Sequence, residues 1–182
     1  MSFVSRGGQK LEHALIQFKI DVTGFICADL GCSTGGFTDC LLQRGAAKVF
    51  AVDTGYGVLE WKLRNEQRVV VMERTNAIHV ELPQPVDLVT IDAGWTKQRI
   101  ILPAAKRLLK PDGIVITLIK PQYEADQPML RKGILPAEHL PDVMETVKAD
   151  IASAGFQLIQ TVTSPIKGSM GNTEILAHLL PV

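Results

Sequence analysis

The chain has 182 residues, of which 46% are hydrophobic and 21% are charged. This length and composition are typical of one globular domain with a full core, so we expect residues 1–182 to form a single domain. Nineteen basic and nineteen acidic residues give a formal net charge of zero, which by itself favours no polyanionic partner. We expect a cytoplasmic chain with no membrane partner, because no apolar run approaches the roughly 20 residues that span a bilayer and no signal-peptide pattern is found.

The three cysteines, Cys27, Cys32 and Cys40, lie close together in the sequence. They form no C-x-x-C pair and have no histidine pair nearby, which argues against a zinc site or a disulfide framework. We therefore expect reduced cysteines and no bound metal.

The first 20 residues predict a helix that packs over the rest of the domain. Apolar residues recur with helical spacing at Leu11, Ala14, Leu15 and Phe18, after the sequence Ser5-Arg6-Gly7-Gly8. Lys10 lies at the edge of this apolar stripe. It is either an ordinary surface lysine or one that leans over a ligand crevice.

The stretch from Asp29 to Thr38 reads Asp-Leu-Gly-Cys-Ser-Thr-Gly-Gly-Phe-Thr. An apolar run leads into it and helical spacing follows it, which predicts a strand, a glycine turn and a helix N-terminus. Glycine lets the backbone turn sharply and approach a ligand closely. A second apolar run, 49–52, ends on Asp53, where such folds place an acid for ribose hydroxyls. The predicted cofactor cradle consists of Asp29, Gly31, Ser33, Gly35, Gly36, Phe37 and Asp53.

Three ligand types compete for this cradle. The dinucleotide pattern G-x-G-x-x-G fails at its middle position, where Ser33 replaces a glycine. Residues 31–35 also match the G-x-S-x-G turn of serine hydrolases, which would need one of His79, His139 and His178 as a base. S-adenosylmethionine needs only a tight turn and an acid for its ribose, and it fits best.

Further strands are predicted at 69–72, at 86–91 ending on Asp92, and at 113–119 ending on Lys120. Asn76, after the first of these, is placed to bond an adenine edge. A helix is predicted over 102–109, with Pro103 in its first turn. Four prolines between 121 and 141 predict a mobile loop over the site.

A helix over 142–154, ended by Gly155, precedes two strands at 156–164 and 173–180. The connection between these strands is too short for a parallel crossover, so they must pair antiparallel. The chain is therefore expected to adopt an α/β, Rossmann-like fold whose mostly parallel, seven-stranded sheet has its last strand reversed.

Charged residues recur at the predicted strand ends, where open α/β sheets bind ligands. Asp92 and Lys120 follow parallel strands, and Glu174 opens the reversed strand at the same edge. With Lys10 from the first helix, two ammonium groups and two carboxylates can converge on one point.

Five stretches of the chain, Ser5–Leu11, Asp29–Phe37, Glu73–Asn76, Lys120–Glu124 and Gly171–Glu174, carry a family resemblance in combination. With them the chain resembles the TlyA-type family of haemolysins and ribosomal RNA methyltransferases, within the FtsJ-like ribose 2′-O-methyltransferases. The resemblance implies a class I methyltransferase fold, S-adenosyl-L-methionine as cofactor and RNA, above all ribosomal RNA, as partner. It carries the Lys-Asp-Lys-Glu catalytic tetrad onto Lys10, Asp92, Lys120 and Glu174, with Asp92 also beside the cofactor.

The resemblance covers only the catalytic domain. TlyA-type proteins usually begin with a small S4-type RNA-binding domain, and this chain starts at the catalytic domain, so we expect weak binding to naked RNA. The segment 93–97 also differs from the family's usual Asp-Val-Ser-Phe-Ile-Ser pattern in the loop that faces the substrate. Five basic residues are expected around one crevice for RNA: Arg6, Lys10, Arg131, Lys132 and Lys167.

The expected activity is methyl transfer to a ribose 2′-hydroxyl of RNA, with Lys120 handling the hydroxyl proton. Three alternatives stay open: a domain that binds cofactor or RNA without catalysis, a membrane-lytic haemolysin, and a serine hydrolase that uses Ser33.

Overall fold

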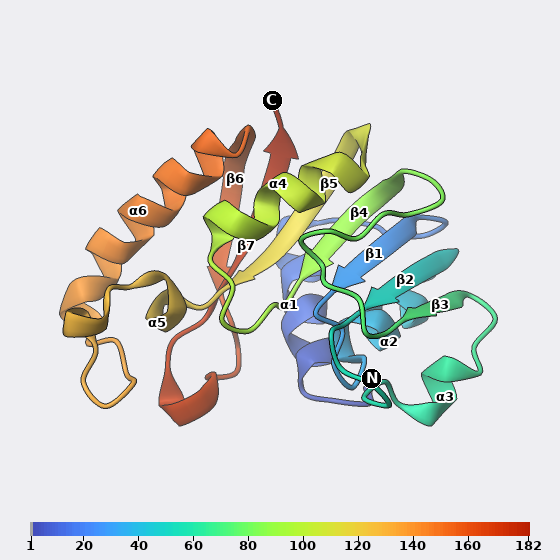
Figure 1. Cartoon of the computed structure of the whole chain (residues 1–182), viewed down its shortest axis with the longest axis horizontal. Helices are drawn as coiled ribbons and strands as arrows, with labels where there is room; N and C mark the ends of the chain where they lie inside the picture. The colour runs from blue at the N-terminus through green and yellow to red at the C-terminus, as the bar shows by residue number, and fades with distance from the viewer. Residues whose placement is uncertain (1) are drawn as a thin grey trace.

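A computed structural model describes residues 2–182 as a seven-stranded sheet with helices on both faces (Figure 1). The strands are β1 (Ile26–Leu30), β2 (Lys48–Val52), β3 (Val69–Met72), β4 (Val86–Ile91), β5 (Leu109–Ile119), β6 (Phe156–Thr163) and β7 (Ile175–Pro181). The helices are α1 (Gly7–Phe18), α2 (Gly36–Gln43), α3 (Trp61–Arg64), α4 (Gln98–Leu108), α5 (Pro121–Glu124) and α6 (Leu140–Ser153), with 3₁₀ turns η1 (Gln127–Met129), η2 (Ala137–His139) and η3 (Ser169–Gly171).

The strand order is β3-β2-β1-β4-β5-β7-β6. β7 runs antiparallel to β5 and β6, and the other pairs are parallel, which confirms the predicted sheet with its reversed last strand. The chain first builds outward from β1 to β3 and then resumes on the other side of β1 with β4. Such a reversal opens a ligand crevice at the carboxyl ends of the strands.

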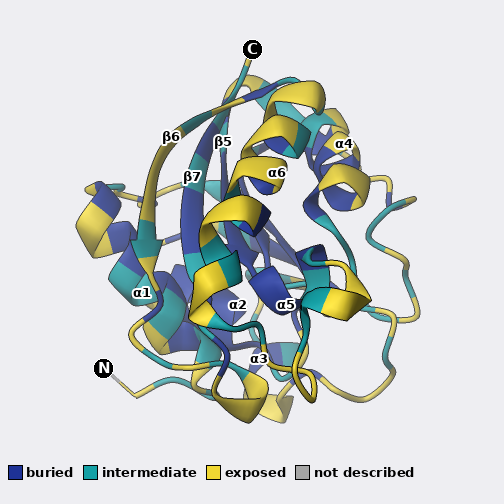
Figure 2. Cartoon of the chain, turned by 90° about the vertical axis from the view of Figure 1, so that its left-hand side faces the viewer, coloured by how far each residue is buried: buried dark blue, intermediate teal, exposed yellow. Residues whose placement is uncertain are grey.

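Two hydrophobic cores lie on opposite faces of the sheet. Leu11 of α1 and Leu41 of α2 belong to one core, and Leu102 of α4 belongs to the other. Val49 and Phe50 are neighbours on β2 but belong to different cores, because successive side chains of a strand point to opposite faces. Figure 2 shows α4 and α6 with their buried sides toward the sheet and their exposed sides outward. No helix among residues 2–182 is long and apolar enough to cross a membrane.

Two element boundaries differ from the prediction. α4 begins at Gln98 instead of Leu102, so Pro103 lies inside the helix and removes one internal hydrogen bond. The early start depends on a distant group, because the Glu124 carboxylate accepts a hydrogen bond of 2.9 Å from the Gln98 backbone N–H. β5 begins at Leu109 instead of 113, because Leu109 pairs with Val86 across an irregular register.

The segment 121–141 is more regular than the predicted loop. It contains α5, η1 and η2, and α6 already begins at Leu140. The mobility of this segment stays a prediction. The predicted helix stop at Gly155 is confirmed by its left-handed backbone, with φ of +79°.

Helix α1 approaches α2 through backbone contacts that only glycine permits. A Cβ atom on Gly36 would lie 2.8 Å from the Gly8 nitrogen and 3.1 Å from the Gly7 Cα. The first turns of both helices therefore meet through their backbones, with only the Ser5 hydroxyl beside them, and Lys10 is brought to the carboxyl edge of the sheet.

Gly36→Ala should push these two helices apart. Overpacking of this kind typically costs about 1–3 kcal/mol of unfolding free energy, which urea denaturation measures. Gly94→Ala is the matched control, because a Cβ there would meet no atom within 4 Å. Equal unfolding free energies for the two variants would contradict the close contact.

Candidate active site

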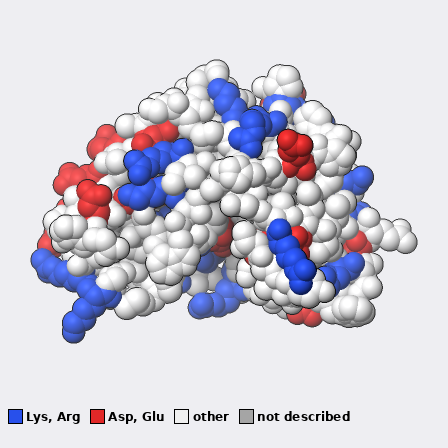
Figure 3. Space-filling model, in the orientation of Figure 1, with Lys and Arg blue, Asp and Glu red and all other residues white. Residues whose placement is uncertain are grey.

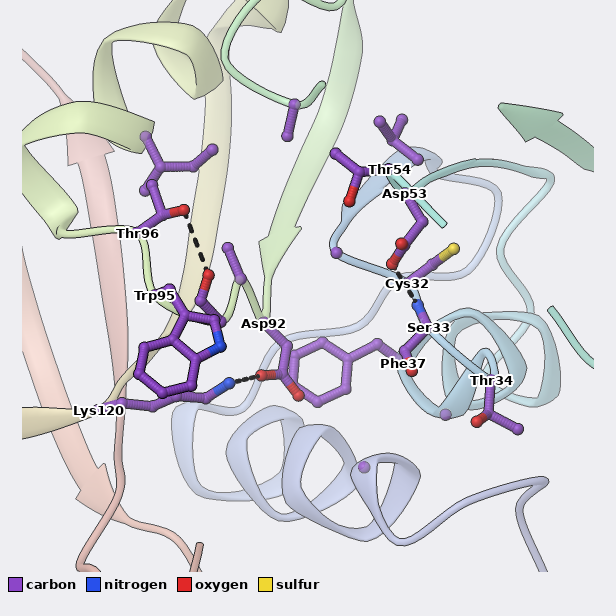
Figure 4. Close-up of a pocket in the computed structure, with 18 of the residues that line it drawn as sticks. Cys32, Ser33, Thr34, Phe37, Asp53, Thr54, Asp92, Trp95, Thr96 and Lys120 are labelled. Atoms are coloured by element: carbon purple, nitrogen blue, oxygen red, sulfur yellow. Dashed lines mark hydrogen bonds and ion pairs between the residues drawn. The ribbon is translucent and has the colours of Figure 1, made fainter. Parts of the chain in front are cut away.

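A cavity of about 610 Å³ opens at the carboxyl ends of the parallel strands. Its lining includes Asp53 after β2, Asp92 after β4 and Lys120 after β5, as predicted from the strand ends. The β1–α2 loop and the start of α1 complete the wall. Figure 4 shows Lys120 reaching Asp92 on one side of the cavity and Asp53 reaching the Ser33 backbone on the other.

The glycine turn between β1 and α2 forms the floor of this cavity. Gly31 has φ of +84°, and a Cβ there would lie 2.7 Å from the Asp92 carbonyl oxygen, so only glycine lets the turn pass this close to the end of β4. Four residues of the predicted cofactor cradle line the cavity: Gly31, Ser33, Gly36 and Phe37. Gly35 is not among the lining residues. Its φ is +102°, and its missing side chain leaves room for Leu59 and Leu63 instead of for a ligand.

Asp29 also lies outside the cavity, contrary to the prediction that it binds the cofactor. Its side chain is fully buried under the glycine turn. One carboxylate oxygen accepts a hydrogen bond of 2.7 Å from the Thr38 hydroxyl, and the other accepts one of 3.0 Å from the Thr90 hydroxyl. Burial raises the pKa of Asp29 to about 7, against the lowering effect of these two hydrogen bonds.

Asp53 joins two loops through its carboxylate. One oxygen accepts a hydrogen bond of 2.8 Å from the Ser33 N–H, and the other accepts one of 2.8 Å from the Gly55 N–H. Each oxygen has a further lone pair, so the carboxylate can also accept hydrogen bonds from ribose hydroxyls. The two backbone contacts hold the acid in position before a ligand arrives.

The wall beyond Asp53 combines apolar side chains with one amide. Asn76 lines the cavity, and its Oδ1 accepts a hydrogen bond of 2.9 Å from the Ile78 N–H. The neighbouring Glu73 has a different task, because its carboxylate accepts hydrogen bonds from the backbone of the 57–59 loop and from Arg64. The bond from Gly57 is the main reason that the pKa of Glu73 is lowered to about 2. Glu73 thus shapes the loop, while Asn76 faces the ligand space.

The four residues of the predicted tetrad form two ion pairs. The Lys120 Nζ lies 2.5 Å from the Asp92 Oδ1, and the Lys10 Nζ lies 2.5 Å from the Glu174 Oε2. Three of the four line the cavity, and Glu174, with 4% of its side chain exposed, is held behind Lys10. Each carboxylate fixes the direction of one ammonium group through an ion pair, which for Lys10 is also a charge-assisted hydrogen bond.

The five basic residues predicted for RNA do not all share this cavity. Arg6 and Lys10 line it, whereas Arg131, Lys132 and Lys167 do not. Arg131 pairs with Glu138 at 3.0 Å. Figure 3 shows basic and acidic side chains interspersed on the face in view, consistent with the zero net charge.

A second cavity of about 560 Å³ lies next to the first and was not predicted. Trp95 lines both cavities, and Tyr123 lines the second. The centroids of the two rings are 4.6 Å apart, and 84% of Trp95 is exposed. Both aromatic residues lie in stretches that the sequence analysis singled out, but nothing in the local pattern indicates that the rings meet.

The first cavity has the size and the donor set for S-adenosylmethionine. Its volume is typical of small-molecule sites. Asn76 and the apolar side chains Val52, Ala77 and Ile78 suit an adenine ring, and Asp53 suits the ribose. No histidine is among its lining residues within 2–182, which argues against a hydrolase built on Ser33.

The sheet order with its reversed seventh strand, together with this cavity, defines a class I S-adenosylmethionine-dependent methyltransferase. Solved methyltransferase structures with 16% and 17% sequence identity share the fold, at TM-scores of 0.68 and 0.70. Residues 3–179 match the FtsJ-like methyltransferase family, and the chain belongs to that family, in its TlyA and hemolysin group.

Similar proteins extend beyond the region that this chain covers. YqxC of Bacillus subtilis is 44% identical over 98% of this chain and 66% of its own length. The 16S/23S rRNA (cytidine-2′-O)-methyltransferase TlyA of Mycobacterium tuberculosis is 40% identical over 98% of this chain and 68% of its own length. A solved structure from Streptococcus thermophilus has a TM-score of 0.96 and 41% identity, and it covers all of this chain, which spans 68% of it.

Titration of Asp29 should make the stability of the protein depend on pH. Its folded pKa of about 7 lies above the ordinary 3.8, so between these pH values the folded chain holds a proton that the unfolded chain has lost. The contribution of Asp29 to the unfolding free energy therefore falls as pH rises from about 4 to about 7, by up to about 4 kcal/mol.

Asp29→Asn should remove this part of the pH dependence, as urea denaturation at a series of pH values measures. Asp112→Asn, at an exposed position, is the control and should keep the slope of the unmodified protein. The same slope in Asp29→Asn would contradict the burial-driven shift.

Asp53→Ala should weaken S-adenosylmethionine binding at least tenfold, because hydrogen bonds to a charged group contribute about 1.5–3 kcal/mol each. Isothermal titration calorimetry measures the affinity, and circular dichroism checks the fold. Asp126→Ala, at an exposed acid that lines the second cavity, should leave the affinity unchanged. Unchanged affinity in Asp53→Ala, or tight binding of NADH, would refute the cofactor assignment.

Proposed function

We propose that the chain transfers a methyl group from S-adenosylmethionine to a ribose 2′-hydroxyl of RNA, with a cytidine of ribosomal RNA as the acceptor nucleotide. The observation that carries this proposal is the pair of lysine–carboxylate contacts at the cofactor cavity. A hydroxyl is a weak nucleophile, and groups that position it and accept its proton are what such a transfer needs from the protein.

The two ion pairs have different roles at the ribose 2′-hydroxyl. When bound, S-adenosylmethionine supplies an electrophilic methyl group on a sulfonium sulfur. Asp53 and Asn76 would hold its nucleoside part, and transfer of its methyl carbon to the ribose oxygen would leave the electron pair of the broken carbon–sulfur bond on sulfur. We assign the hydroxyl proton to Lys120, which Asp92 orients from 2.5 Å. Lys120 accepts this proton in its neutral amine form, after its ammonium group has released a proton to solvent. Lys10, oriented by Glu174, lines the same cavity and can hold the hydroxyl or a neighbouring phosphate.

The second cavity offers a place for the base of the acceptor nucleotide. Sequence-specific RNA recognition commonly uses splayed-out bases that stack on aromatic rings. Trp95 stands between the two cavities, so a nucleotide whose ribose lies at Lys120 can place its base against the Trp95 and Tyr123 rings. The divergent 93–97 loop then contributes to target choice through Trp95.

Ribosomal RNA is proposed as the substrate because of the names of two similar proteins. The Mycobacterium tuberculosis and Campylobacter jejuni relatives, 40% and 32% identical, are both named as rRNA (cytidine-2′-O)-methyltransferases. The tetrad and the cofactor cavity of this chain supply what that chemistry requires. Arg6 beside the cavity and the exposed Lys132 are available to phosphates, and such contacts make RNA affinity fall with salt.

Lys120→Ala should lose about 10²- to 10⁴-fold in turnover, the usual contribution of positioned proton transfer. Its cofactor affinity should change little, since Asp53 and Asn76 hold the nucleoside part. Methyl transfer from labelled S-adenosylmethionine to ribosomal subunits from cells that lack this protein, with mass spectrometry of the RNA, measures turnover and locates the product.

The matched control is Lys62→Ala, because Lys62 is 62% exposed and lines neither cavity. It should keep full turnover. An RNA with a 2′-deoxy nucleotide at the acceptor position should accept no methyl group. Methylation of that RNA would place the product on a base and refute the ribose assignment.

A further inference from the structure

Gln122 is a buried amide whose hydrogen-bonding groups are not used within the protein. Its residue exposure is 5%, and neither its amide oxygen nor its amide nitrogen has a hydrogen-bond partner among residues 2–182. It lies in α5, two residues after Lys120, and it lines the second cavity. Buried amides without partners are rare in proteins, because they lose their bonds to water and gain none in return.

A ligand in the second cavity would explain why the amide of Gln122 is buried without a partner. His178 also has unpartnered ring nitrogens, but it lines neither cavity and its ring stacks on Phe18. Gln122 instead belongs to the wall of a space beside the proposed acceptor ribose, and its amide atoms are covered in the structure. A rotation of the side chain would bring the amide to a ligand in that space, which can supply the donor and the acceptor that the protein does not.

The walls of this cavity are tied together by hydrogen bonds. Asn172, itself 3% exposed, accepts a bond from the Leu135 N–H and donates bonds to the carbonyls of Gly133 and Ser169. These contacts join the hairpin after α5 to the loop before β7. On the other side, Lys97 donates to the Glu124 carbonyl at 2.9 Å. The cavity is thus built in advance and is not an accidental gap between loops.

We propose that the Gln122 amide reads the edge of the acceptor nucleobase and is a specificity-determining residue of this enzyme. This inference rests on the proposed function. Cytosine presents its 4-amino donor beside its N3 acceptor, and a glutamine amide presents an acceptor beside a donor, so the two groups can form a bidentate pair. The terminal torsion of glutamine is broad, which lets the amide turn toward the base. The aromatic pair supplies stacking, which every base accepts, and Gln122 supplies hydrogen bonds to the 4-amino group and N3 of the base.

The test is a binding cycle that requires no turnover. Cytidine 5′-monophosphate and its analogue without the 4-amino group are titrated into the protein saturated with S-adenosylhomocysteine, which keeps the nucleotides out of the first cavity. Fluorescence of Trp95 reports occupancy in a Trp61→Phe background, since the chain has only these two tryptophans. The parent should bind cytidine monophosphate about 10- to 100-fold more tightly than the analogue. Gln122→Leu should bind both equally, at the level of the analogue.

The melting temperature distinguishes a role of Gln122 in base recognition from a role in the stability of the fold. Removing an unpartnered buried amide should leave the melting temperature unchanged or higher. Gln122→Met, of similar length, is the second variant should Gln122→Leu fail to fold. Gln127→Leu, at an exposed glutamine lining the same cavity, should keep the full preference for cytidine monophosphate.

Three binding results would overturn the inference: equal binding of both nucleotides by the parent, a preference that survives in Gln122→Leu, or no binding of cytidine monophosphate. A lower melting temperature with equal weakening of both ligands would make Gln122 structural, and this would also overturn it. Failure of the proposed function is a separate result. It would show as an absence of methyl transfer to ribosomal subunits, and the nucleotide titrations could still be interpreted because they require no methyl transfer.

Discussion

The site depends on the close junction between β1 and β4. The buried Asp29 carboxylate binds Thr38 at the start of α2 and Thr90 on β4. Gly31, one residue beyond β1, passes so near the Asp92 backbone that no side chain fits between them. The hydrogen bonds of Asp29 and the close packing of Gly31 therefore fix the glycine turn relative to Asp92, the residue that orients Lys120. A buried carboxyl with a raised pKa serves this role because its two hydroxyl partners bind it in either protonation state.

The proposed catalytic groups come from both ends of the chain. Lys10 lies on the first helix and Glu174 lies just before the last strand, yet their charged atoms are 2.5 Å apart. Partly buried ion pairs of this kind add little net stability, because desolvation offsets much of the attraction. The role of these ion pairs is to orient the two lysines, so that each side chain directs its amine to one place in the cavity. The glycine contact between α1 and α2 makes that placement possible by letting the first helix approach the sheet edge.

In the proposed function, the first cavity binds the cofactor and the second binds part of the substrate. In the first, Asp53, Asn76 and apolar side chains suit a nucleoside, and nearly all of these groups come from strand ends and the loops after them. In the second, Trp95 comes from the loop after β4, and Gln122 and Tyr123 come from the short helix α5 that follows β5. Trp95 belongs to both. Loops on a rigid sheet tolerate sequence change, so a divergent 93–97 segment can alter the substrate side while the cofactor side is preserved.

The sequence by itself determined the parts whose signals are local. Periodicity located all seven strands and the main helices, the short β6–β7 connection fixed the reversed strand, and the acids at strand ends marked one edge of the sheet. Only the tertiary structure decided which of these residues face the cavity. Asp29 turns under the glycine loop, and α4 begins early because Glu124 caps it from 26 positions away. The second cavity is formed by residues between 95 and 172, brought together by side-chain contacts. Spacing along a chain specifies local backbone geometry, whereas burial and partner choice depend on packing between distant segments.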